Sequence, residues 1–86
     1  MPEFKWNVLK SERLKKTRGV SFEEILAGTI IRSIAHPARP EQKVFLVLYR
    51  DYIWAVPYVD EGKVIFLKTL YPSRKYTKWF KEGRFS

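Results

Sequence analysis

Apolar and polar residues follow two different periods along this chain, and the period changes near residue 29. Before that point the sequence predicts a short strand at residues 4–6 and then a basic, solvent-facing helix from Asn7 to Thr17. Asn7 suits the N-cap position, because its side-chain oxygen can accept a hydrogen bond from a free backbone N–H group. Gly19 predicts the end of this helix, since glycine is favoured just past a helix C-terminus.

A second helix is predicted to start at Ser21. Ser21 and Glu24 have the spacing of a capping box, in which each side chain accepts a hydrogen bond from the backbone N–H group of the other residue. Three apolar side chains are expected to point inward from this helix, namely Phe22, Ile25 and Leu26. Gly28 is expected to end it.

From Thr29 onward the apolar residues recur every second position, which is typical of β-strands. Four strands are predicted, at Thr29–Ile34, Lys43–Tyr49, Tyr52–Val59 and Val64–Leu70. The segment from His36 to Pro40 is expected to form a loop because it contains two prolines. Tight turns are expected at residues 50–51 and 60–63.

The last predicted element is a short basic helix over residues 73–82, which begins near Pro72 and packs through Tyr76, Trp79 and Phe80. The element order is therefore β-α-α-β-β-β-β-α, within a single domain of residues 1–86. Strands joined by two-to-four-residue turns pair antiparallel. We accordingly predict an α+β fold, with an antiparallel sheet of four to five strands and the helices packed on one face.

The charge of this chain is concentrated at its two ends. The 17 Lys and Arg residues exceed the 9 Asp and Glu residues, for a formal net charge of +8. Residues 1–20 carry +4 and residues 63–86 carry +6, while the middle carries −2. If the fold brings the ends together, they form one positive surface that attracts nucleic acid or an acidic protein. Basic residues also keep small domains in solution, which is the alternative interpretation.

The composition argues against several classes of function. Without Cys and with one His, the chain has no disulfide and no thiolate or multi-histidine zinc site. The carboxylates lack ligand spacing, and there is no glycine-rich phosphate loop or nucleophilic triad, so we expect no metal and no cofactor. The longest apolar stretch, residues 52–59, is far shorter than the ~20 residues of a membrane helix. The N-terminus lacks the apolar core of a signal peptide, so we expect a cytoplasmic protein.

Basic and aromatic residues lie together near the C-terminus, where Lys68 and Arg74 flank Tyr71. Metal-independent RNA cleavage requires an oriented ribose 2′-OH, stabilisation of a phosphorane-like transition state and the transfer of two protons. We predict that Arg74 and Lys68 stabilise this charge and that His36 and Tyr71 move protons. A solvated helix turn, an ordinary loop histidine and a core tyrosine are the alternatives.

Further residues are predicted to bind the RNA backbone. They are Lys10, Lys16, Arg18, Arg50, Ser73, Lys75 and Lys78. Ser73 can also cap the last helix, whose first backbone N–H groups favour a phosphate. The tryptophans Trp6, Trp54 and Trp79 could stack on bases, but core positions suit them better in a domain of this size.

Two stretches share a pattern with one protein family. The first contains Phe4, Trp6, Asn7 and Lys10, followed by the run from Arg18 to Glu24, and the second is Ser73-Arg74-Lys75-x-Thr77. They resemble the F-x-W-D, K-H-G-V-S-F-E-E and S-A-R-K-A-T motifs of the BrnT family of bacterial type II toxins. The chain departs from the family at Asn7 in place of Asp, at Arg18 in place of His and at Phe80 in place of Glu.

The resemblance implies a small RelE-like endoribonuclease that cleaves mRNA and arrests growth. It also implies a cognate antitoxin, typically a ribbon-helix-helix protein, that neutralises the toxin in a hetero-oligomer and alone contacts operator DNA. The missing His and Glu leave another function open, namely a non-catalytic module that binds RNA, DNA or an acidic protein.

Overall fold

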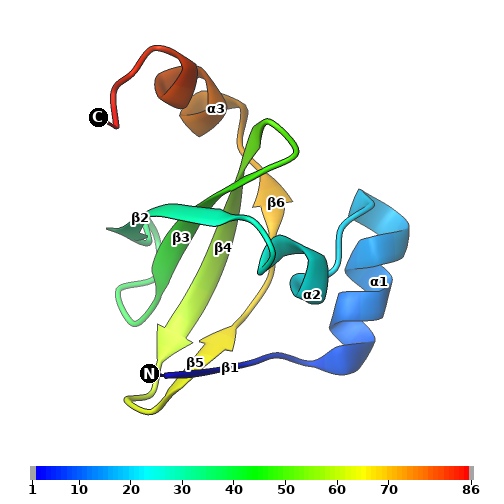
Figure 1. Ribbon diagram of the computed structural model, residues 1–86. Helices are drawn as coiled ribbons and strands as arrows, with labels where there is room; N and C mark the ends of the chain where they lie inside the picture. Colours follow the sequence, from blue (N-terminus) through cyan, green and yellow to red (C-terminus); the bar gives the residue numbers. More distant parts are fainter. Residues whose placement is uncertain (1, 86) are drawn as a thin grey trace.

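The computed structural model describes residues 2–85 (Figure 1). Its elements are β1 (Glu3–Lys5), α1 (Val8–Arg18), α2 (Phe22–Ile25), β2 (Thr29–Ala35), β3 (Lys43–Tyr49), β4 (Tyr52–Asp60), β5 (Val64–Leu67), β6 (Tyr71–Pro72) and α3 (Arg74–Lys81). The described part of the chain is thus an α+β fold with three helices and one mixed six-stranded sheet.

The predicted helix starts and the central hairpin are confirmed. Asn7 caps α1 by accepting a hydrogen bond from the Lys10 N–H group at 3.0 Å, and Gly19 follows the helix in the left-handed conformation. Ser21 and Glu24 form both bonds of a capping box, although α2 is only one turn long. Between β3 and β4, Arg50 and Asp51 both have positive φ angles, as a tight two-residue hairpin turn requires.

The strand order of the sheet is β1-β5-β4-β3-β2, and β6 also pairs with β4. Strands β2, β3 and β4 form the expected antiparallel meander. Strand β1, however, runs parallel to β5, so the prediction of an entirely antiparallel sheet is wrong. A parallel pair needs a long crossover, and here both N-terminal helices and the meander separate the two strands in the sequence.

The predicted strand Val64–Leu70 is interrupted, which is a second correction. Leu67 pairs with Tyr58, and Tyr71 pairs with Ala55, so four steps along this strand correspond to three steps along β4. Pro57 lies in β4 opposite the interruption, where its carbonyl accepts a 2.8 Å hydrogen bond from the Lys68 N–H group. Since proline has no N–H group to return, the ladder breaks here and one extra residue is accommodated as a bulge.

The helices lie on opposite faces of the sheet, so the expectation of a single helix-covered face is also wrong. Leu14 of α1 and Phe22 and Ile25 of α2 join one core with alternate residues of β3 and β4. On the other face α3 contributes Tyr76 and Phe80 to a smaller core, whose buried members are Val44, Leu46, Ile53 and Ala55. Figure 1 accordingly shows α3 near the β3–β4 turn, away from α1.

Candidate functional site

A hollow of about 240 Å³ opens where α1, the β2–β3 loop, β4 and the β5–β6 bulge meet. It is lined by Lys10, His36, Arg39, Gln42, Pro57, Lys68, Thr69 and Tyr71. Four of these residues were proposed from the sequence, namely Lys10, His36, Lys68 and Tyr71. The fold therefore brings together candidates from the first helix, the central loop and the C-terminal third of the chain.

The hollow is positively charged. Lys10, Arg39 and Lys68 line it without a carboxylate, and within residues 2–85 none of these three cations forms an ion pair. Burial, followed by the positive charges of Lys68, Arg13 and Arg18, holds the pKa of Lys10 below its ordinary value. The cations therefore repel one another, and an anion that enters the hollow relieves this repulsion.

The bulge between β5 and β6 positions two of the candidates. Lys68 leaves the strand here, and its ammonium group lies 5.3 Å from the centre of the Phe66 ring. Tyr71 begins β6, where pairing with Ala55 holds its backbone while its side chain is 36% exposed. Tyr71 is therefore a surface residue at the hollow rather than part of a core.

His36 is held by its own loop. Its Nδ1 atom accepts hydrogen bonds from the Ala38 and Arg39 N–H groups, both at 3.1 Å. A nitrogen that accepts hydrogen bonds carries no proton, so the proton of the neutral ring is on Nε2. The Nδ1 lone pair is therefore engaged with the backbone of the loop.

Arg74 lies outside the hollow, in the first turn of α3. Its side chain is exposed, and in the described structure it has no hydrogen-bonded or ionic partner. It follows Tyr71 by three residues in the sequence but does not line the hollow. Lys75 also lies on α3, with its ammonium group 4.9 Å from the centre of the Trp79 ring.

The other predicted RNA-binding residues are dispersed. Lys16 lies beside a separate hollow of about 480 Å³ between α1 and α2, and Arg18 ends α1. Arg50 is in the β3–β4 turn, 5.0 Å from the Tyr49 ring centre and 3.8 Å from a Glu24 oxygen. Lys78 is exposed on α3. These side chains could contact RNA only outside the hollow.

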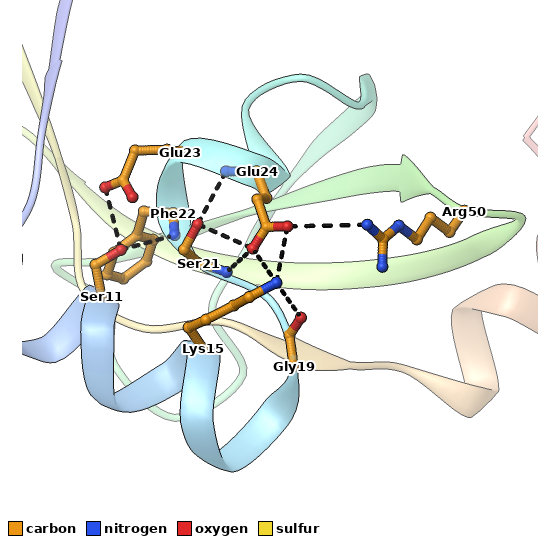
Figure 2. Close-up of polar contacts among 8 residues, drawn as sticks. All are labelled: Ser11, Lys15, Gly19, Ser21, Phe22, Glu23, Glu24 and Arg50. Atoms are coloured by element: carbon orange, nitrogen blue, oxygen red, sulfur yellow. Dashed lines mark hydrogen bonds and ion pairs between the residues drawn. The ribbon is translucent and has the colours of Figure 1, made fainter.

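The first family-like stretch is largely occupied in holding the two N-terminal helices together (Figure 2). Phe22 is fully buried, and its N–H group donates to the Ser11 hydroxyl of α1 at 3.0 Å. Glu24 accepts from the Ser21 N–H group at 3.0 Å and forms a 2.9 Å ion pair with Lys15. The Lys15 hydrogen bond is the main reason why the pKa of Glu24 lies below its ordinary value. This motif therefore explains folding rather than chemistry.

The second family-like stretch anchors α3. Ser73 caps the helix, since its hydroxyl accepts a hydrogen bond from the Tyr76 N–H group at 3.1 Å. Thr77 is buried, and its hydroxyl accepts a 2.9 Å hydrogen bond from the Ile53 N–H group of β4. Only the intervening Arg74 and Lys75 point outward to solvent.

The tryptophans are partly or fully packed against other side chains. Trp54 belongs to the core on the α1–α2 face and is 9% exposed. The ring centre of Trp6 lies 6.1 Å from that of Phe22. Trp79 does not join the sheet core but packs edge-on against Tyr76 and contacts Phe85. Core packing therefore accounts for Trp54 and Trp6.

Arg39 and Gln42 line the hollow but were not proposed from the sequence. Both lie in or next to the proline-containing loop, and loop composition does not show where a side chain points. The only feature of the sequence that could have indicated this site is the position of Arg39 between two prolines.

No family model, characterised protein or solved structure matches this chain. Within residues 2–85 no three His, Asp or Glu side chains are grouped so that they could hold a metal ion. The helices of this described region are also too short or too polar for any of them to cross a membrane. A functional assignment must therefore rest on the hollow and the residues around it.

Proposed function

We propose that this chain is a metal-independent endoribonuclease, the BrnT-like toxin of a type II toxin–antitoxin pair with a RelE-like fold. The observation that supports this most is the hollow, which joins Lys10, His36, Lys68 and Tyr71 around unneutralised positive charge. All four side chains can donate a hydrogen bond or a proton, and a protonated lysine can also bind a phosphate as a cation.

The reaction uses the RNA's own ribose as nucleophile. The 2′ oxygen bonds to phosphorus while the bond from phosphorus to the 5′ oxygen breaks, which leaves a 2′,3′-cyclic phosphate and a 5′-hydroxyl. A base removes the 2′ proton, and an acid protonates the departing 5′ oxygen. Positive charge stabilises the additional negative charge on the phosphoryl oxygens in the transition state.

The surroundings of each side chain suggest its role. We assign the base to Lys10, because a lysine whose pKa is lowered is neutral more often and can accept a proton. Tyr71, an exposed residue that lines the hollow, would protonate the leaving oxygen, and Lys68 would stabilise the transition state. His36 would hold its loop through Nδ1 instead of moving a proton. Arg74 would bind the adjacent phosphate.

The same proposal covers the partners. RNA would be the substrate, and the toxin would act in the cytoplasm, where mRNA is found. A cognate ribbon-helix-helix antitoxin would cover the basic surface in a hetero-oligomer, and operator DNA would be bound through that antitoxin.

The test is induced expression in bacteria, with growth and total RNA followed over time. Wild type and Lys63→Ala should arrest growth and degrade RNA, whereas Lys68→Ala should do neither. Lys63 is the matched control because it is an exposed cation in the β4–β5 turn, outside the hollow. Both exposed substitutions should change the free energy of unfolding by less than about 0.5 kcal/mol.

Two results would contradict the proposal. If Lys68→Ala were as toxic as wild type, the hollow would not be the site of RNA cleavage. Folded wild-type protein that binds RNA and leaves it intact would instead support the non-catalytic binding module.

A further inference from the structure

Arg39 is the third cation of the hollow. The proposed mechanism assigns roles to Lys10 and Lys68 but none to Arg39. It comes from the loop between β2 and β3, whereas Lys10 lies on α1 and Lys68 directly follows β5. Its side chain is exposed and has no carboxylate partner within the described residues. An arginine without a partner, beside two further cations, offers a planar donor fork that matches phosphate oxygens.

The backbone around Arg39 is held by four hydrogen bonds. Two are the bonds from the Ala38 and Arg39 N–H groups to His36 Nδ1. The Gln42 N–H group donates to the Arg39 carbonyl at 3.0 Å, and the His36 N–H group donates to the Gln42 carbonyl at 3.3 Å. His36 thus connects the end of β2 to the residue that carries the guanidinium.

We propose that Arg39, Lys10 and Lys68 form a binding site for an RNA phosphodiester, and that His36 is a positioning residue that holds Arg39 in it. This inference rests on the proposed ribonuclease function and adds the group that binds the scissile phosphate. The imidazole acts through Nδ1 on the loop, and Arg39 contacts the substrate.

The hollow offers several donors to a single phosphate group. Three cations line one hollow of about 240 Å³. The adjacent Tyr71 hydroxyl adds a neutral donor. A phosphodiester has two free oxygens and two ester oxygens, so it can accept from several of these donors at once.

Binding can be measured without cleavage. The probe is a fluorescent single-stranded RNA oligonucleotide methylated at every 2′ oxygen, which lacks the nucleophile, and the readout is anisotropy with the full chain. Arg39→Ala should weaken binding by roughly tenfold, because it removes a charge-assisted hydrogen bond. Lys63→Ala, which also removes one positive charge but outside the hollow, should leave binding within about twofold.

His36 is tested by a pair of substitutions. His36→Asn keeps a side-chain acceptor that can bind backbone N–H groups two and three residues ahead, whereas His36→Ala keeps none. A positioning role predicts that His36→Asn binds the probe and cleaves unmodified RNA nearly as wild type does. His36→Ala should weaken probe binding to the level of Arg39→Ala.

The outcomes separate this inference from the proposed function. Equal loss of binding in Arg39→Ala and Lys63→Ala would overturn the phosphodiester site, even if the wild type cleaves RNA. A His36→Asn variant that binds normally but does not cleave would overturn the positioning role and place the ring in the chemistry. If probe binding depends on Arg39 but the wild type cleaves no RNA, the phosphodiester site is supported and only the ribonuclease function is contradicted.

Discussion

Lys10 differs from the other basic residues of α1 because it is half-buried and lines the positively charged hollow. Its pKa is lowered by burial first and by the charge of Lys68 second. Below this pKa the ammonium form binds anions, and above it the neutral amine can accept a proton. The same residue can therefore favour binding at lower pH and proton transfer at higher pH.

The Lys10→Arg variant separates these two properties. Arginine stays protonated at all accessible pH values, so probe binding should persist while cleavage falls by about 10²–10⁴-fold. In wild type, cleavage should rise with pH through the lowered pKa of Lys10, and this rise should be absent from the variant. Rates are measured on a short RNA across the alkaline range.

Lys68→Arg is the control for the change of side-chain shape. Because Lys68 is assigned a purely electrostatic role, this variant should keep most of the cleavage and the wild-type pH profile. Full activity of Lys10→Arg would show that another group is the base.

At the scale of elements, α3 is joined to the sheet by polar contacts as well as by apolar packing. The Ser73 N–H group donates to the Ile53 carbonyl at 2.8 Å, and the Ile53 N–H group donates to the Thr77 hydroxyl. Both backbone groups of Ile53 are thus satisfied by the start of the helix rather than by another strand. This arrangement places Arg74 and Lys75 at the surface.

Thr77→Val should lower the free energy of unfolding by about 1–3 kcal/mol, because the buried Ile53 N–H group loses its acceptor while the side-chain volume is kept. Thr17→Val is the matched control. The Thr17 hydroxyl donates to the Arg13 carbonyl on exposed α1, where water can replace it, so the change should stay within about 0.5 kcal/mol. Urea unfolding measures the free energy of unfolding of both variants. Equal losses would show that the hydrogen bond from Ile53 to Thr77 contributes no more to stability than the exposed one of Thr17.

At the scale of the whole molecule, the two basic ends of the chain meet at the hollow, which both Lys10 and Lys68 line. The N-terminal helix contributes Lys10 to the hollow beside Lys68, while α3 covers the other face of the sheet. Among residues 2–85, four cations are paired with carboxylates, namely Lys15, Arg50, Lys81 and Arg84. Long RNA would therefore contact the hollow first and reach α3 as it extends from the site.

The salt dependence of binding tests this arrangement. For a single-stranded probe the slope of log K against log salt is about −0.7 for each phosphate contact. Replacing Lys75 and Lys78 together by Ala should make a long probe's slope shallower by about 1.4 and leave a dinucleotide's slope unchanged. Lys81→Ala is the control, because Lys81 lies 3.9 Å from Asp51 and is already paired. An unchanged slope for the long probe would exclude contact with α3.

Local features of this protein were determined by the sequence alone. The caps at Asn7, Ser21 and Ser73 depend on residues only three positions apart, and the strand Lys43–Tyr49 follows from its apolar pattern and the adjoining turn. Side-chain chemistry alone also made Lys68 and Tyr71 candidates, since metal-independent RNA cleavage needs a cation and a group that can transfer a proton. The predictions of the caps and of this strand are confirmed, because the interactions behind them are short in sequence.

The tertiary structure decided which of these local pieces meet. The parallel pairing of β1 with β5, the placement of α3 on the opposite face and the entry of Arg39 into the hollow all join segments distant in the sequence. The bulge at Lys68 arises because Pro57 of a neighbouring strand lacks an N–H group. No period along one strand contains that information, since it depends on which residue the partner strand places opposite.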